Sequence, residues 1–127
     1  MKKEVVILVY FITGFLMSCS SPPPSDPKLK EAYAIHQKYL SIGDESMKML
    51  KSVQAEDEKR QELESQIMDW GANIIEVPGF PCSKDREFYE HSHNGPELAL
   101  TPEEMLEVQK ELLDSLQAIR LRIEALH

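Results

Sequence analysis

The sequence lacks the short motifs that mark common enzyme classes. It contains no glycine-rich phosphate loop, no nucleophile elbow around a serine and no HExxH metalloprotease helix. It also shows no alternating apolar and polar pattern typical of β-strands, and no internal repeat. These absences argue against a protein built on a β-sheet, and we expect that the protein is not an enzyme.

Long hydrophobic runs are scarce as well. The longest apolar stretch, Val5–Met17, has 13 residues, whereas a helix that spans a bilayer needs about 20. The hydrophobic region of a secretory signal has about 7–15 residues. Lys2 and Lys3 precede this stretch and the small residue Ser18 follows it. The pattern predicts a signal peptide over residues 1–18.

The four residues Leu16–Cys19, "LMSC", resemble the lipobox of bacterial lipoproteins. This resemblance implies that a lipoprotein signal peptidase cuts before Cys19. It also implies that Cys19 carries a diacylglyceryl thioether and an N-acyl chain such as palmitate, which together hold a protein stably on a membrane. Ser20 follows the cysteine in place of Asp, and by the sorting rules of lipoproteins this implies the outer membrane, with the domain facing the periplasm.

Cysteine and basic residues are both few. Cys82 is the second of only two cysteines, so a lipidated Cys19 leaves it without an intrachain disulfide partner. Cleavage after Ser18 would leave 12 basic and 21 acidic residues, a net charge of −9. This charge disfavours nucleic acid as a partner. The expected partners are the lipid bilayer through acylated Cys19, and a protein partner or a second copy of the chain through the helix faces.

Residues 19–27 are rich in proline and predict a tether between the lipid and the domain. Four of the eight residues from Ser20 to Pro27 are proline, which excludes a helix interior or a central strand. In polyproline II form these eight residues would span about 25 Å. Asp26 and Pro27 fit the N-cap and first position of a helix, so a helical domain is expected over residues 28–127.

Three helices are expected in this domain, over residues of about 28–53, 58–77 and 102–126, with a loop over 78–100. The first apolar stripe contains Ala32, Ile35, Tyr39, Ile42, Ser46, Met49 and Val53, and the second contains Leu63, Ile67, Trp70, Ile74 and Val77. The fold class is therefore all-α, an antiparallel three-helix bundle. Because residues 54–61 contain no Gly or Pro, the alternative is one long bent helix with a second helix packed on it. The change from basic to acidic residues near positions 54–57 favours a turn there.

The last helix has the strongest local signal. Thr101 fits an N-cap, Pro102 the first helical position and Glu104 the closing residue of a capping box. Its apolar face contains Met105, Val108, Leu112, Ile119, Ile123 and Leu126, widened by Leu106, Leu113 and Leu116.

A second resemblance covers most of the mature chain. It rests on His36, "IMDW" (67–70), "VPGF" (77–80), a loop that carries histidine, and "TPEEMLEVQKEL" (101–112). These features resemble small helical lipoproteins of Bacteroidota-type bacteria. That resemblance implies a helical domain in the cell envelope and brings no activity or cofactor with it.

Metal-ligand side chains gather in the loop over 78–100. Cys82, His91 and His93, with Glu90 as a further ligand, could form a site for zinc or copper. The alternative is a polar connector between two helices. His36 and Trp70 are interpreted as packing residues of the bundle. We therefore expect a lipoprotein with a structural or protein-interaction role, and the alternative function is metal binding through Cys82, His91 and His93.

Overall fold

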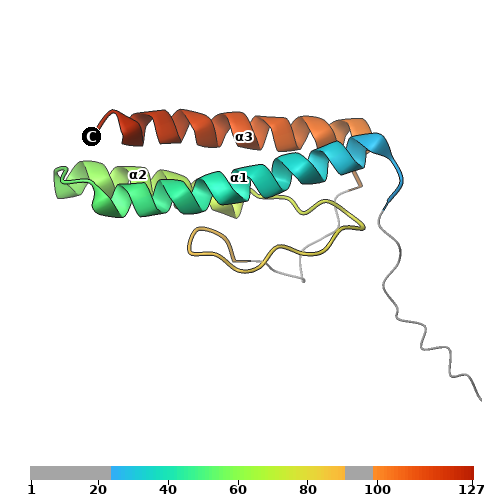
Figure 1. The fold of residues 1–127 in the computed structure, drawn as a ribbon, viewed down its shortest axis with the longest axis horizontal. Helices are drawn as coiled ribbons and strands as arrows, with labels where there is room; N and C mark the ends of the chain where they lie inside the picture. Colours follow the sequence, from blue (N-terminus) through green and yellow to red (C-terminus); the bar gives the residue numbers. More distant parts are fainter. Residues whose placement is uncertain (1–23, 91–98) are drawn as a thin grey trace, which may run out of the picture.

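Three helices pack side by side in the computed structural model, which describes residues 24–90 and 99–127 (Figure 1). They are α1 (Pro27–Ser52), α2 (Asp57–Ala72) and α3 (Pro102–Glu124). α2 runs antiparallel to the other two, and α3 runs in the same direction as α1. The predicted all-α three-helix bundle is confirmed. The signal peptide and Cys19 lie outside the described residues.

The two predicted N-caps set where α1 and α3 begin. The Asp26 carboxylate accepts the backbone N–H groups of Lys28 at 2.8 Å and Leu29 at 3.3 Å. At the start of α3 the Thr101 hydroxyl accepts the Glu104 N–H at 3.2 Å, and the Glu104 carboxylate accepts the Thr101 N–H at 2.8 Å. These bonds satisfy backbone donors that have no partner inside the helix.

A short turn over residues 53–56 separates α1 from α2, so the alternative of one long bent helix is wrong. Val53 adopts an extended conformation, its N–H bonds to the Leu50 carbonyl, and its side chain is buried. Lys51 lies in the last turn of α1, and Asp57 and Glu58 lie in the first turn of α2. This distribution complements both helix dipoles, as the sequence indicated.

The second helix ends at Ala72, five residues before the predicted end at Val77. Asn73 leaves the helical region with φ −99° and ψ 2°, and its side-chain amide donates to the Asp69 carbonyl at 2.8 Å. Pro78 also disfavours helical backbone at Val77. Ile74 and Val77 are nevertheless buried, because the extended chain after α2 continues along the bundle.

The core contains most residues of the two predicted stripes, but the buried face of α1 is not centred on the first stripe. Ile35, Ile42 and Met49 of the predicted stripe are only partly buried. Ala32, Tyr39 and Ser46 of the predicted stripe are buried, and the other buried positions of α1 are His36, Leu40, Gly43, Met47 and Leu50. The face therefore includes a histidine and a glycine, two residue types that an apolar pattern passes over.

Two ion pairs between α1 and α3 show how these helices are aligned along their length. Lys28 pairs with Glu103 at one end of α1 and α3, and Glu45 pairs with Arg120 at 3.0 Å further along. Both pairs lie at the surface, where such contacts contribute little free energy. Their equal sequence separation of 75 residues shows that α1 and α3 are parallel and in register. Among the described residues, no helix combines the length and apolarity that a bilayer crossing requires.

Candidate functional site

The predicted metal ligands are only partly within the described residues. Cys82 is a free, exposed thiol and Glu90 is exposed. His91 and His93 lie outside the described residues. Across residues 24–90 and 99–127, no group of three or more His, Cys, Asp or Glu side chains has a geometry that could hold a metal ion. The zinc or copper site therefore stays a prediction.

An open hollow of about 610 Å³ lies beside the loop, lined by Met68 and residues 85–90. Glu90 belongs to this lining and Cys82 does not. The hollow has three acidic side chains, Asp85, Glu87 and Glu90, and one basic one, Arg86. The Arg86 guanidinium pairs with Asp44 of α1, and Glu87 pairs with Lys51 at 2.6 Å. Two of the charged residues thus attach this part of the loop to α1.

The chain from residue 73 to residue 90, here called the strap, continues along the bundle beyond the end of α2 and then turns back (Figure 1). Its most buried side chains are those of Val77 and Phe88, each 2 % exposed. The Phe88 ring lies over Gly43 of α1 and 5.6 Å from the Trp70 ring, and the Phe88 backbone lies against Gly71 of α2. Two glycines without side chains therefore make the space for this one aromatic residue.

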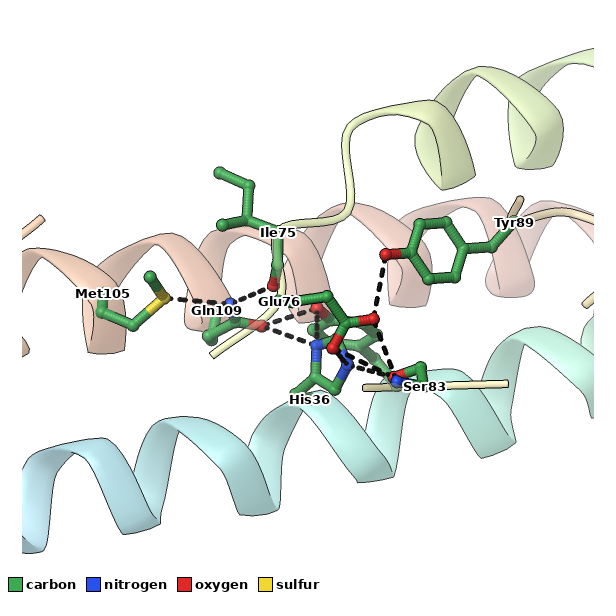
Figure 2. A network of polar contacts seen from close by, with 8 residues as sticks. His36, Ile75, Glu76, Ser83, Tyr89, Met105 and Gln109 are labelled. Carbon is green, nitrogen blue, oxygen red and sulfur yellow. Dashed lines mark hydrogen bonds and ion pairs between the residues drawn. The ribbon is translucent and has the colours of Figure 1, made fainter. Parts of the chain in front are cut away.

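A cluster of polar side chains holds the strap to α1 and α3. We call it the polar cluster, and it consists of His36, Tyr39, Glu76, Ser83, Tyr89 and Gln109. Figure 2 shows that His36 of α1, Gln109 of α3 and three residues of the strap, Glu76, Ser83 and Tyr89, point toward one another. His36 and Gln109 are fully buried, as is Tyr39. Buried polar groups of this kind are tolerated because they hydrogen-bond to one another.

Each nitrogen of His36 faces a different side of the cluster. Nδ1 lies 2.5 Å from the Tyr39 hydroxyl, and this hydroxyl donates to Gln109 Oε1 at 2.6 Å. Nε2 lies 2.6 Å from Ser83 Oγ and 3.1 Å from Glu76 Oε2. The imidazole therefore links the helices on one side to the strap on the other.

Gln109 connects α3 to the strap through the backbone. Its side-chain amide donates to the Ile75 carbonyl at 2.8 Å (Figure 2). The same amide lies 3.3 Å from the sulfur of Met105. This donor leaves the carbonyl oxygen of the Gln109 side chain turned toward Tyr39 and His36.

Glu76 is the acidic centre of the cluster. Burial by itself raises the pKa of a carboxyl group, but the hydrogen bond and positive charge of His36, with hydrogen bonds from Tyr89 and Ser83, outweigh it and lower the pKa of Glu76 to about 2. Tyr89 donates its hydroxyl to Glu76 at 2.9 Å. Burial, and then the nearby Glu76 carboxylate, raise the pKa of Tyr39 and the pKa of Tyr89. Glu76 is therefore ionised and both tyrosines are neutral near pH 7.

Ser83, His36 and Glu76 lie within hydrogen-bonding distance, but their arrangement differs from a hydrolytic triad. In a triad the serine and the acid address opposite nitrogens of the imidazole, so that one proton can move while the acid fixes the ring. Here Ser83 and Glu76 both address Nε2. The Ser83 hydroxyl also lies 3.3 Å from the same carboxylate. The geometry is that of a structural cross-link.

The sequence predicted that two members of this cluster, Tyr39 and His36, lie inside the bundle, and it did not single out the other four. Tyr39 belonged to the apolar stripe of the first helix, and it is completely buried. His36 was expected to pack in the bundle, and it is completely buried. Glu76, Ser83 and Gln109 carried no signal of their own, because polar residues near a helix end or in a loop usually face water. One available sign was position: Gln109 stands four residues after Met105 and three before Leu112, in the middle of the apolar face of α3.

We compared the chain with protein-family models, with curated proteins and with solved structures, and none of the three comparisons gave a match.

Proposed function

We propose that this chain is a lipid-anchored, helical lipoprotein of the bacterial cell envelope, with a structural or protein-interaction role at the periplasmic face of the outer membrane. The observation that carries the anchor is the lipobox-like Leu16–Cys19 after a 13-residue apolar run. The first capped helix begins at Pro27, only eight residues after Cys19. A lipid on Cys19 would therefore be joined to the first helix of the domain by a short tether.

The interaction role is supported by where the polar chemistry of the domain lies. His36, Tyr39 and Gln109 are completely buried, and their polar atoms bond to each other and to the strap. These groups stabilise the fold and are not presented to a substrate. The solvated outer faces of the helices are among the surfaces that remain available for recognition.

The lipid anchor is tested by metabolic labelling with a fatty-acid probe, with and without globomycin, an inhibitor of lipoprotein signal peptidase. We expect the wild-type chain and a Cys82→Ala variant to be labelled and processed alike. A Cys19→Ala variant should lose the label. Equal labelling of the Cys19→Ala variant, or processing that globomycin leaves unchanged, would contradict the anchor.

The interaction role is tested by placing a photo-crosslinking residue at one exposed position of each helix in turn, in cells. Suitable positions are Gln37 of α1, Ser65 of α2 and Gln117 of α3. We expect one face to give a discrete adduct of defined mass, either with a partner or with a second copy of the chain. The other two positions serve as matched controls, and adducts from none of the three would count against the role.

A further inference from the structure

We infer that one end of the bundle, built from Pro24, Leu29, Tyr33, Phe80 and Leu100, rests on the phospholipid headgroups of the membrane that holds Cys19. We call these five residues the proximal surface. This inference rests on the proposed lipid anchor and adds to it the face that the domain turns toward the bilayer.

The chain between Cys19 and the folded domain is short. Pro24 is packed on the domain, because its ring lies where a side chain at Gly79 would stand, within 2.6 Å of a Cβ at that position. Only five Cα-to-Cα steps separate Cys19 from Pro24. Even a fully extended chain of that length spans no more than about 18 Å. The proximal surface therefore stays close to the lipid, whereas the turn over residues 53–56 lies about 39 Å further along α1.

The proximal surface consists of apolar and aromatic side chains. Leu29, Tyr33, Phe80 and Leu100 are partly exposed and pack on a small apolar cluster of Ala32, Val77, Met105 and Leu106. The rings of Tyr33 and Phe80 stack at 4.4 Å with an angle of 14° between them. Tyr is enriched at membrane interfaces because its ring is apolar and its hydroxyl is polar, and Phe and Leu are typical of the apolar side of elements that lie on a membrane.

The charged residues beside the proximal surface lie at the starts of α1 and α3. Lys28 pairs with Glu103, which joins the first turns of α1 and α3. The Asp26 and Glu104 carboxylates accept backbone N–H groups at the two helix starts. Lys28 neutralises Glu103, the helix starts favour the Asp26 and Glu104 carboxylates, and zwitterionic headgroups carry no net charge that would repel them.

Gly79 fixes the geometry that brings Pro24 and Phe80 together. Its φ of +82° lies in the left-handed region that side chains rarely adopt, and any Cβ there would collide with the Pro24 ring. The "VPGF" turn thus seats the end of the tether directly beside the aromatic stack.

The test uses the full, lipidated chain in phosphatidylethanolamine-rich vesicles. In a Cys82→Ser background, a single thiol is introduced either by Pro78→Cys beside the proximal surface or by Gln54→Cys in the far turn, and each is labelled with a fluorophore. Nitroxide on the lipid headgroups should quench the label at position 78 strongly. It should leave the label at position 54 almost unaffected, because quenching by contact does not act over about 39 Å. Equal quenching at both positions would overturn the inference.

A second measurement separates docking from mere tethering. Inserting a Gly/Ser linker of about 12 residues after Ser21 would roughly triple the fully extended length of the chain between the lipid and Pro24. If the proximal surface binds headgroups, the label at position 78 stays quenched in the chain with the inserted linker. Replacing both Tyr33 and Phe80 by serine in that longer chain should remove the quenching. Loss of quenching on linker insertion alone would refute docking. Flotation of each sample with the vesicles is the control: a chain that fails to float contradicts the lipid anchor itself, which is a different failure.

Discussion

Phe88 and the two glycines beneath it offer a test of the strap that separates side-chain contacts from backbone contacts. A Cβ added at Gly43 would lie 2.6–3.1 Å from three atoms of the Phe88 ring. A Cβ added at Gly71 would collide with the Phe88 carbonyl oxygen and would lie 2.7 Å from the carbonyl carbon. The first clash involves only the side chain of Phe88, and the second involves its backbone. Replacing Phe88 by alanine removes the first obstacle and leaves the second.

The magnitudes follow from this difference. Phe88→Ala should lower the free energy of unfolding by about 3–5 kcal/mol, since the ring is almost fully buried. Gly43→Ala overpacks the site at a cost of about 1–3 kcal/mol, against a gain of up to about 1 kcal/mol in helix propensity. In the Phe88→Ala background the overpacking is gone, so Gly43→Ala should become neutral or stabilising. The coupling energy between Gly43 and Phe88 is then about 1–3 kcal/mol.

Gly71→Ala should destabilise the domain in both backgrounds, because the carbonyl of residue 88 remains when its ring is removed. The assay is urea unfolding of a chain without residues 1–18 and with Cys19→Ser, followed by circular dichroism and by the fluorescence of Trp70. Trp70 is the only tryptophan and its ring lies 5.6 Å from Phe88. Rescue of Gly71→Ala by Phe88→Ala, or an absence of coupling at Gly43, would refute this description of the strap.

Three further predictions concern the cluster, the loop and the last helix. Glu76 has a pKa of about 2 when folded and an ordinary value of 4.5, so it stabilises the fold above about pH 4.5, and that stability should disappear between about pH 4.5 and pH 2. A Glu76→Gln variant should be less stable at pH 7 and should lose less stability over that acid range, as urea midpoints against pH would show; equal slopes would contradict the assignment. The metal hypothesis predicts micromolar or tighter zinc or copper binding by calorimetry, lost when Cys82, His91 and His93 are replaced together, and equal binding by that triple variant would exclude it. Thr101→Ala should lower the free energy of unfolding by about 1 kcal/mol through loss of the capping box, whereas an unchanged urea midpoint would mean that the box contributes nothing.

The sequence predicted those parts of the fold that depend on local interactions. Asp26 and Thr101 cap helices because a short polar side chain before a proline favours that conformation whatever lies around it. The turn over residues 53–56 followed from the change of charge between the ends of two helices. Each of these features involves residues fewer than about five positions apart, so one sequence is enough to find them.

The early end of α2 could not be predicted in the same way. The pattern Leu63, Ile67, Trp70, Ile74 and Val77 continues at helical spacing after the helix has ended at Ala72. Ile74 and Val77 are buried as the pattern requires, but they reach the core from an extended chain. Apolar periodicity reports burial, and it cannot by itself tell a helix from a strap that lies along the same groove.

This strap also gives a physical reason for polar residues on the inner faces of α1 and α3. α2 has 16 residues against 26 in α1 and 23 in α3, so it leaves part of the groove between its neighbours uncovered. An extended chain that fills this space brings backbone carbonyl and N–H groups without helical partners, and burying them unpaired is costly. Gln109 supplies a donor to the Ile75 carbonyl, and Glu76 supplies an acceptor for the Ser83 N–H at 3.2 Å.

His36 then completes the arrangement from the other side. The side-chain amide of Gln109 donates to the strap, so its side-chain oxygen needs a donor. The Tyr39 hydroxyl provides one at 2.6 Å. The ionised Glu76 needs a partner inside the bundle, and the imidazole of His36 provides it at 3.1 Å. Each of these polar side chains thus provides the donor or acceptor that another one needs. The series starts with the unpaired backbone groups of the strap. We therefore expect Gln109→Met to lower the free energy of unfolding by about 1–3 kcal/mol, because it leaves the Ile75 carbonyl without its donor, even though it makes α3 more regularly apolar. Urea unfolding measures this change, and an unchanged midpoint would contradict the account.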